Sequence, residues 1–424
     1  MPPPRCAAFD VRDWLRRAGL EAGAAVAFVC AEADPSQRNS LIAEELVPAF
    51  ARLGVSLRIL DYRRHPRDAM TALKDPANLF CICFDGFGAE LLVATRKPGG
   101  FRSAFEYFGK PLFDIMHDCP AHEIMGHQVD ARFRHRFLLI PNYDYVAMAQ
   151  AMGQRNARFV PSITYPAAVC SPLKPLAERS IDVLVPVTAG TPERSRERHT
   201  DVSYRARVYR DIFDAVVIAA TANLRLDPLQ ELCSACREAG LLFDPSDPDS
   251  RFLLTTVVDC VETGRQRTLL HAIAHLPVTL ASSASFDDLP SGSCITKILP
   301  AHRSDLLEQM RNAKCVVTLT SPITGYDDVA MAAFTAGCLV LSSPNHLLQG
   351  TFGHQRGSLM FQTQQHLVDQ LGQIVSDFPR LAAIAACGHR QAMAQFSPTR
   401  LAETILSILL LEQASEPPVT APDE

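Results

Sequence analysis

The chain has 424 residues, more than one ordinary hydrophobic core organises, so two domains are the first expectation. Hydrophobic residues make up 47% and charged residues 21%, a composition typical of a globular protein and not of a disordered one. The 41 lysines and arginines stand against 46 aspartates and glutamates, for a net charge of −5, so no basic excess indicates a nucleic-acid partner.

The compartment is predicted from what the sequence lacks. Its apolar runs are shorter than the stretch that crosses a bilayer, and the start "MPPPRCAAFDVRDW" lacks the apolar segment of a secretory signal. The 13 cysteines are scattered without the spacing of a disulfide framework, which favours buried thiols in a reducing compartment. We therefore expect a cytoplasmic protein without a transmembrane segment.

The first 165 residues alternate between strand-like and helix-like patterns. Apolar runs typical of buried strands occur at 24–32, 56–62, 78–86, 111–119, 136–142 and 158–164. Runs that are apolar on both faces and separated by helices indicate a parallel sheet covered on both sides. Residues 1–165 are thus predicted to form an N-terminal Rossmann-like domain.

A second series of the same kind follows a proline-rich linker at 166–180. Its strand-like runs occur at 181–188, 277–283, 294–301, 314–320 and 338–343. A long helical stretch over 204–275 is expected to break near "LRLDP" and "FDPSDPDS". Residues 181–397 are predicted to form a C-terminal Rossmann-like domain. The fold class is therefore α/β, with two facing Rossmann-like domains and a cleft between them.

The end of the chain carries helical patterns at 365–376, 380–394 and 398–413. The apolar C-terminal helix at 398–413 either crosses back onto the first domain or pairs with a second copy of the chain. Residues 414–424, rich in Pro, Glu and Ala, are predicted to be a disordered tail.

Ligands of such open parallel sheets bind at the carboxyl ends of the strands. In the first domain these ends carry Asp85 and Gly86, and then His117, Asp118 and His122 in "MHDCPAHEIMGH". Histidine beside a carboxylate can accept a proton from a hydroxyl group near neutral pH, and aspartate can do so directly. Equally, Asp118 can cap a helix that starts just after it, at a proline.

Two further patterns contain residue types that can bind a metal. In "HEIMGH" the histidines are five residues apart, whereas two ligands on one helix face need a spacing of four. The pair in "CSAC" (233–236) is isolated inside a helical run, which favours a packed helix over a zinc or redox site. No metal site is predicted.

In the second domain, the loop "VTAGTPERSRERH" follows the first strand. Thr188 and Gly190 allow the backbone to approach a phosphate closely, while the arginines in 194–198 either add positive charge or form a solvated loop. Lys297 and Leu299 lie at a later strand end, where the backbone could contact the edge of a base.

The stretch "TSPITGYDDVAMAAFTAG" combines a polar loop with the start of a helix. Free backbone N–H groups at a helix start can meet an anion, and Thr324, Gly325 and Tyr326 lie just before it. Asp327 and Asp328 are themselves anions in the first turn and would compete with a phosphate. They fit a ribose, a sugar hydroxyl or a plain helix cap better.

Taken in order, these segments resemble GT-B glycosyltransferases of the group-1 type, near the bacterial spore-maturation-protein-like branch. The resemblance is carried by "GKPLFDIMHDCPAH", "NYDYVAMAQAMGQRNARFVPSITYP", "SIDVLVPVTAG" and "GYDDVAMAAFTAGCLVLSSPNHLLQGTF". It implies an acceptor site in the first domain and a nucleotide-sugar site in the second. It also implies that the nucleotide-sugar is a co-substrate, with no separate cofactor and no metal.

Carried over to this sequence, the resemblance assigns Gly325, Tyr326 and Asp328 to the donor loop and Gly337 to the turn that follows its helix. It assigns 297–300 to the base and 188–190 to the diphosphate. Three positions depart from the family pattern: Asp327 and Val329 stand where histidine and arginine are usual, and Ala332 where many members have a ribose-binding glutamate. Lys297 or an arginine of 194–198 would then supply positive charge.

The leading prediction is transfer of a sugar from a nucleotide-sugar to a hydroxyl or other nucleophile of a glycan, protein or small-molecule acceptor. If the sugar is inverted, Asp118 or His117 accepts the proton; if configuration is retained, both mainly position substrates. Asp85, Gly86 and His122 are assigned to the acceptor. Two alternatives stay open: a binding or scaffold subunit of a glycosylation complex with an altered donor site, and an epimerase of the same two-domain plan. A homo-oligomer is compatible with either.

Overall fold

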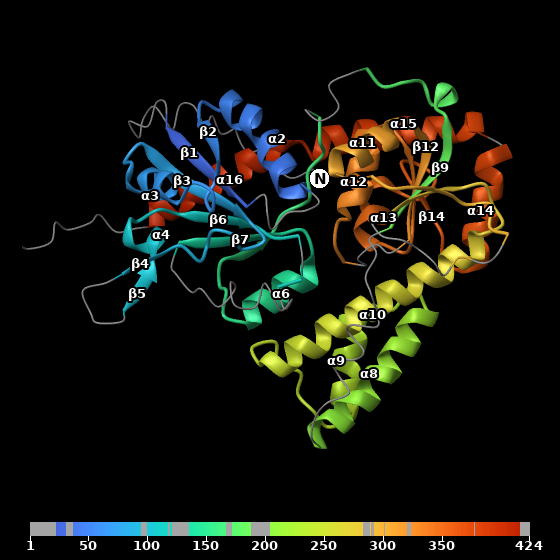
Figure 1. Ribbon diagram of the computed structural model, residues 1–424, viewed down its shortest axis with the longest axis horizontal. Helices are drawn as coiled ribbons and strands as arrows, with labels where there is room; N and C mark the ends of the chain where they lie inside the picture. The colour runs from blue at the N-terminus through green and yellow to red at the C-terminus, as the bar shows by residue number, and fades with distance from the viewer. Residues whose placement is uncertain are drawn as a thin grey trace, which may run out of the picture.

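The computed structural model describes most of the chain, in the ranges 23–30, 37–94, 100–117, 119–120, 135–166, 172–187, 204–282, 289, 292–300, 302–319, 324–376 and 378–415. Two six-stranded parallel sheets, one from each half of the chain, lie side by side with helices on both faces (Figure 1). The predicted α/β class with two Rossmann-like domains is confirmed.

The first sheet has the strand order β2-β1-β3-β6-β7-β8, and every neighbouring pair is parallel. Its strands are β1 (Ala24–Val29), β2 (Ser56–Asp61), β3 (Asn78–Phe84), β6 (Leu112–Ile115), β7 (Arg136–Ile140) and β8 (Ala157–Phe159). The residues of β6 and β7 are all buried. Because helices cover both faces, these strands need apolar side chains at nearly every position.

Within the described part of residues 23–166, four helices and a hairpin accompany this sheet. The helices are α2 (Arg38–Arg52), α3 (Pro66–Lys74), α4 (Ala104–Tyr107) and α6 (Tyr143–Ala151). The antiparallel hairpin of β4 (Leu92–Ala94) and β5 (Phe101–Ser103) was not predicted from the sequence. The expected strand at 158–164 was too long, because pairing ends at Phe159 and Pro161 has no N–H to donate.

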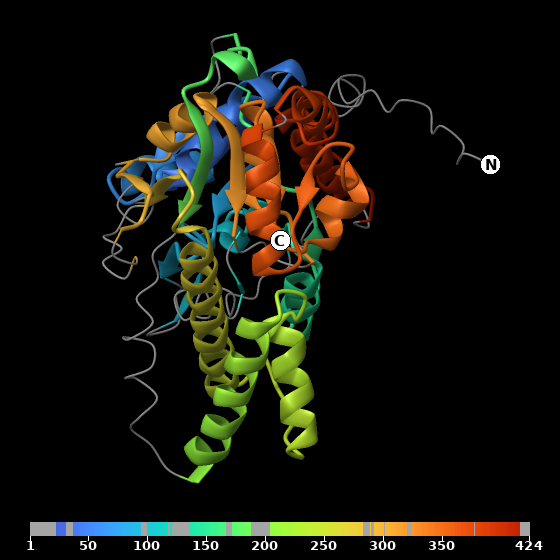
Figure 2. The same ribbon diagram turned by 90° about the vertical axis from the view of Figure 1, so that its right-hand side faces the viewer.

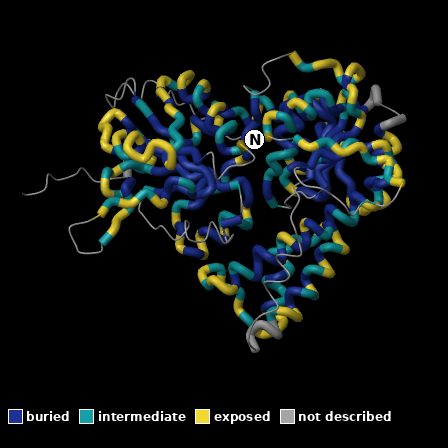
Figure 3. Tube along the Cα trace, in the orientation of Figure 1, coloured by how far each residue is buried: buried dark blue, intermediate teal, exposed yellow. Residues whose placement is uncertain are grey.

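The second sheet has the order β11-β10-β9-β12-β13-β14, again parallel between neighbours. Its strands are β9 (Ile181–Val187), β10 (Thr279–Ser282), β11 (Thr296–Ile298), β12 (Ala313–Thr318), β13 (Leu339–Ser342) and β14 (Leu359–Met360). Around it lie η1 (Leu176–Glu178), α11 (Arg303–Arg311), α12 (Asp328–Thr335), α13 (His346–Phe352), α14 (Gln364–Ser376) and α15 (Phe378–Gln395). The buried strands form the centre of each half, whereas helix surfaces facing outward are exposed (Figure 3).

Among the described residues, a three-helix excursion separates β9 from its neighbour β10. It consists of α8 (Tyr204–Ala222), α9 (Pro228–Glu238) and α10 (Pro248–Ile273), which extend away from both sheets (Figure 1, Figure 2). The expected breaks in the helical stretch 204–275 are confirmed. The excursion shares one apolar cluster with β7 and α6, and Gln230 Nε2 donates to Asp144 Oδ2 at 3.4 Å. The excursion therefore contacts the first half of the chain.

Helix α16 (Pro398–Ser415) returns to the first half, where it packs against α2, and Arg52 Nη1 donates to Thr399 Oγ1 at 3.4 Å (Figure 1). Of the two expectations for this helix, crossing back onto the first domain is confirmed. The helix runs two residues beyond its predicted end at 413, which corrects the start of the predicted tail; residues 416–424 lie outside the described residues. No helix in the described ranges is long and apolar enough to cross a membrane.

Candidate functional site

The turn after β3 holds a carboxylate in an unusual backbone conformation. Asp85 has φ 51°, and Gly86, which follows it, has φ 76°. A positive φ is uncommon for a residue other than glycine, and such conformations persist where the surroundings enforce them. The Asp85 side chain, only 2% exposed, accepts a hydrogen bond from Arg38 Nη2 at 2.6 Å and from the His117 backbone N–H at 2.8 Å.

Three charged or titratable side chains meet at this turn. Burial alone would raise the pKa of Asp85. The attraction of Arg38 and His117 outweighs this effect, so the pKa of Asp85 lies below its ordinary value. Asp85 is therefore ionised at neutral pH. The His117 side chain is 7% exposed, and its Nδ1 lies 3.9 Å from Asp85 Oδ1.

The second half contributes the start of α12. Asp327 is the N-cap, and its Oδ1 accepts from the Val329 N–H at 2.8 Å, so the cap role is confirmed. Asp328 lies in the first turn, where its Oδ2 accepts from Arg303 Nη2 at 2.6 Å and its Oδ1 accepts from the Tyr165 hydroxyl. The side chains of Asp328 and Arg303 are 17% and 10% exposed.

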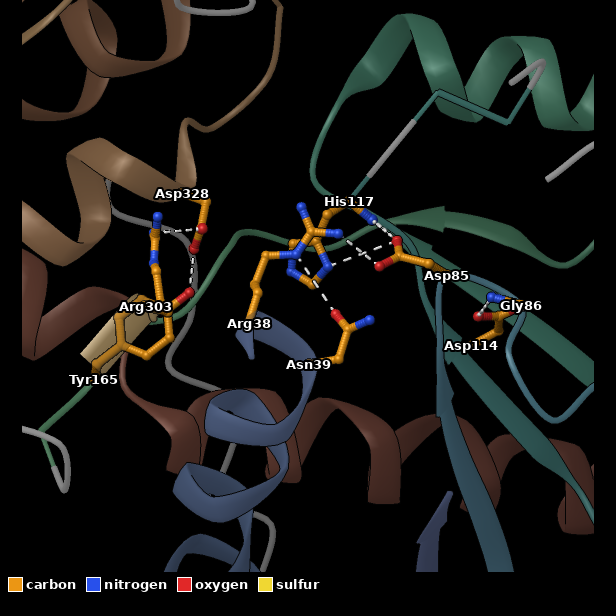
Figure 4. Close-up of polar contacts among 9 residues, drawn as sticks. All are labelled: Arg38, Asn39, Asp85, Gly86, Asp114, His117, Tyr165, Arg303 and Asp328. Carbon is orange, nitrogen blue, oxygen red and sulfur yellow. Dashed lines mark hydrogen bonds and ion pairs between the residues drawn. The ribbon is translucent and has the colours of Figure 1, made fainter. Parts of the chain in front are cut away.

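The Asp328 carboxylate of this second group stays charged because of its arginine neighbours. Burial would raise the pKa of Asp328, but Arg303 and then Arg38 oppose it, and the pKa is lowered. Burial, reinforced by Asp328, raises the pKa of Tyr165 well above its ordinary value, so this hydroxyl remains a donor. Figure 4 shows the two groups facing each other, with Arg38 between them. The site is thus assembled from both halves of the chain.

The loop that precedes α12 docks onto the first half. Tyr326 N–H donates to the Pro141 carbonyl at 2.8 Å, and Tyr143 N–H donates to the Thr324 carbonyl at 3.1 Å. Gly325 lies opposite Asn142 in this short antiparallel bridge. A Cβ atom on Gly325 would approach Asn142 Nδ2 to 2.9 Å, so the close approach of the two segments requires glycine here.

Side chains of the same loop are also engaged. Thr324 Oγ1 donates to Asp144 Oδ2 at 2.7 Å, which joins the loop to α6. The Tyr326 hydroxyl hydrogen-bonds Thr351 Oγ1 at 2.8 Å, and its ring packs edge-on against Phe396 with the centroids 4.9 Å apart. Three residues predicted to face a donor therefore take part in contacts between and within the two halves.

The remaining predicted residues are distributed as follows. Lys297 and Leu299 lie at the end of β11, both exposed, Leu299 to 71%. Gly337 has φ 68° in the turn after α12, as expected for a left-handed position. Ala332, where the sequence resemblance leads to a glutamate, is fully buried. Four predicted residues lie outside the described ranges: Asp118, His122, Thr188 and Gly190.

Three residues of the site were missed by sequence reasoning: Arg38, Tyr165 and Arg303. Arg38 and Arg303 are the first residues of α2 and α11, where the helix dipole disfavours a cation. An arginine at a helix start is thus a local conflict, and such conflicts mark functional positions. This signal was present in the sequence. Tyr165 carried no comparable signal.

Within the described part of the chain, no group of three or more His, Cys, Asp or Glu side chains is arranged to hold a metal ion. The site instead concentrates two guanidinium groups, two carboxylates, an imidazole and a phenol. This set can hold an anion, orient hydroxyl groups and transfer a proton.

No family model and no curated protein matches the sequence. Among solved structures, HepE from Anabaena in complex with UDP-glucose is similar at a TM-score of 0.52 and 10% identity, over 93% of this chain and 100% of that one. Sucrose-phosphate synthase from Thermosynechococcus elongatus has a TM-score of 0.48 at 11% identity, over 93% and 100% of the two chains. The likeness to HepE agrees with the two parallel sheets, and the chain has the two Rossmann-like domains of the GT-B fold.

Proposed function

We propose that this chain transfers a sugar from a nucleotide-sugar to a hydroxyl or other nucleophile of a glycan, protein or small-molecule acceptor. The observation that carries the proposal is the pair of arginines at helix starts in opposite halves, Arg38 and Arg303, each held by a carboxylate. The similarity to a structure that contains UDP-glucose supports a nucleotide-sugar as the donor class.

The arginines suit the leaving group of such a reaction. When the bond between the sugar C1 and the phosphate oxygen breaks, negative charge develops on the nucleoside diphosphate, and fixed guanidinium groups stabilise it. In this structure Asp328 accepts from Arg303, which leaves the remaining N–H donors of the fork for a phosphate. We therefore propose that arginine, without a metal ion, supplies the positive charge, and that no separate cofactor takes part.

His117 is our candidate for the proton acceptor, with Asp118 retained as the alternative from the sequence. The new bond forms between the acceptor oxygen and C1, and the hydroxyl proton passes to the imidazole. Asp85, ionised and 3.9 Å from Nδ1, stabilises the imidazolium that results. The negative charge of Asp85 favours this assignment, because a base next to a carboxylate gains a proton more readily.

The other assignments remain proposals. The donor would lie against the second half, near Thr188, Gly190, Lys297, Leu299 and the loop before α12; the acceptor would lie near Asp85, Gly86 and His122. Kinship with the spore-maturation-protein-like branch, a bacterial origin and a cytoplasmic location rest on the sequence. Every cysteine in the described ranges is a free thiol, which supports a reducing compartment.

The direct test is a panel of UDP-, GDP- and dTDP-sugars, scored for release of free nucleotide with and without candidate acceptors. We expect release with at least one donor, and a loss of about 10²–10⁴-fold in His117→Gln if it is the general base. Arg303→Met should lower kcat/KM by at least about 10-fold, since charged hydrogen bonds contribute about 1.5–3 kcal/mol. The matched control is Arg311→Met, at the other end of α11, where Arg311 pairs with the exposed Glu308.

Absence of release with every donor, together with no thermal shift on adding UDP, GDP or dTDP, would rule the proposal out. The alternative of a scaffold subunit is favoured by one observation: the loop Thr324–Tyr326 is engaged with Pro141 and Tyr143 of the first half. Co-purification with an active glycosyltransferase, combined with a folded chain that ignores nucleotides, would support that alternative.

A further inference from the structure

A fully buried ion pair lies inside the first sheet. Asp114 in β6 and Arg136 in β7 are joined by a 2.5 Å contact between Oδ2 and Nη2, and both side chains are 0% exposed. Their neighbours along the strands are apolar, among them Phe113, Ile115 and Phe137. The pair is therefore an exception in an otherwise apolar sheet.

Stability of the fold is a weak explanation for this pair. Removing two charges from water is costly, and replacing a buried ion pair by apolar side chains of similar volume is often neutral or stabilising. The side chains are thus better explained by a geometric task that apolar residues cannot perform.

The contacts of Asp114 indicate that task. While Oδ2 accepts from Arg136, Oδ1 accepts from the backbone N–H of Gly86 at 2.9 Å. The N–H of the preceding Asp85 donates to the Ile115 carbonyl at 3.0 Å. Two successive N–H groups of the turn after β3 are thereby fixed to β6, one by a backbone carbonyl and one by the Asp114 carboxylate. Figure 4 shows the contact of Asp114 with Gly86.

This attachment has a consequence for the site. Asp85 is held with φ 51°, from where its carboxylate reaches both Arg38 and the N–H of His117. Without the acceptor on Asp114, Gly86 N–H would be buried without a partner in this arrangement, and the turn would move to satisfy it. The carboxylate of Asp85 moves with the turn.

We propose that Asp114 is a positioning residue, oriented by Arg136, that holds the Asp85–Gly86 turn so that Asp85 meets His117 and Arg38. The inference deepens the proposed transfer reaction and rests on it for its kinetic consequence. Its geometric part, the position of Asp85, is independent of that reaction.

Two double variants separate positioning from a merely structural role. Asp114→Asn with Arg136→Met removes both charges but keeps an oxygen at Oδ1 for Gly86. Asp114→Leu with Arg136→Met removes both charges and also the oxygen that accepts the hydrogen bond of the Gly86 N–H. Because each variant deletes the charges together, neither leaves an unpaired ion in the core. If the leucine variant does not fold, Asp114→Ala with Arg136→Met gives the same comparison.

In the kinetic experiment, the Asp114→Leu, Arg136→Met variant should lose about 10–100-fold in kcat with little change in KM. A misplacement of about 1 Å can cost about 100-fold in rate. The asparagine variant should stay within about threefold of the wild type. Equal losses in the two variants, in proportion to their stability, would overturn the proposal.

For the geometric arm, the pKa of the Asp85 carboxyl is followed by carbon-13 NMR. This pKa should stay below its ordinary value in the wild type and in the asparagine variant. It should rise in the Asp114→Leu, Arg136→Met variant, because Asp85 then moves away from Arg38 and His117. The same pKa in all three proteins would overturn the positioning role. If the wild type transfers no sugar but the pKa pattern holds, positioning stands and the proposed function fails.

Discussion

Removal of the charge on Asp328 should reveal how strongly its ion pair with Arg303 stabilises the fold. In Asp328→Asn, the amide keeps an oxygen that can accept from Tyr165, but Arg303 loses its carboxylate partner. Arg303 is 10% exposed and has little access to water that could replace it. The perturbation thus isolates the charge from the shape of the side chain.

The magnitude follows from burial. A buried pair broken on one side costs about 3–5 kcal/mol, whereas an exposed pair contributes about 0–1 kcal/mol. With Asp328 17% exposed and one hydrogen bond retained, we expect Asp328→Asn to lower the free energy of unfolding by about 2–4 kcal/mol. Asp182 and Lys314 form a control pair with the same 2.6 Å contact but a half-exposed carboxylate. Asp182→Asn should cost less than about 1 kcal/mol.

The assay is urea unfolding followed by circular dichroism, repeated for Arg303→Met and for the double variant. Coupling between the two positions should be about 1–3 kcal/mol.

The lowered pKa of Asp328 sets the pH dependence of stability. The stabilisation by the Asp328 charge is fully present above the unfolded pKa of about 3.9 and is lost as pH falls through the lower folded pKa. The gap between wild type and Asp328→Asn should therefore be constant from about pH 5 to 8 and shrink below about pH 4. Additive single effects, or equal costs at Asp328 and Asp182, would refute the reasoning.

Two further substitutions test one contact between the halves and one contact within the three-helix excursion. Gly325→Ala places a Cβ 2.9 Å from Asn142 Nδ2 and should cost about 1–3 kcal/mol, measured by thermal unfolding. Gly350→Ala is the control without a clash, because nothing lies within 4 Å of the added atom. Arg265→Met removes hydrogen bonds to the carbonyls of three residues at the end of α8 and the turn after it, so limited proteolysis should cut near residues 222–227 faster than in the wild type. An unchanged cleavage rate would contradict the conclusion that Arg265 stabilises the end of α8 and the turn after it.

Much of the fold could be predicted because parallel strands buried on both faces leave a strong signal. The apolar runs that became β1, β3 and β7 were located correctly for this reason. The β4–β5 hairpin was missed because its three-residue strands are too short for a periodic pattern. Strand β14, with two residues, was missed for the same reason.

The site was predicted only in part. Asp85 and His117 follow strand ends, where the parallel-sheet rule directs attention, and the structure brings them together. Tyr165 depends on a tertiary arrangement that joins it to Asp328, 163 positions away in the chain. Asp114 appeared as one polar residue in an apolar run, and neither Arg136 nor the Gly86 N–H could be recognised as its partner from spacing alone.

The central claim is that a nucleoside diphosphate binds between the two halves and is held by arginine. A crystal structure of the chain soaked with UDP or GDP tests it most directly. We predict density for the diphosphate at the guanidinium groups of Arg303 and Arg38, with the base toward the end of β11. No nucleotide density at saturating concentration, or a nucleotide bound away from Arg303 and Arg38, would contradict the claim.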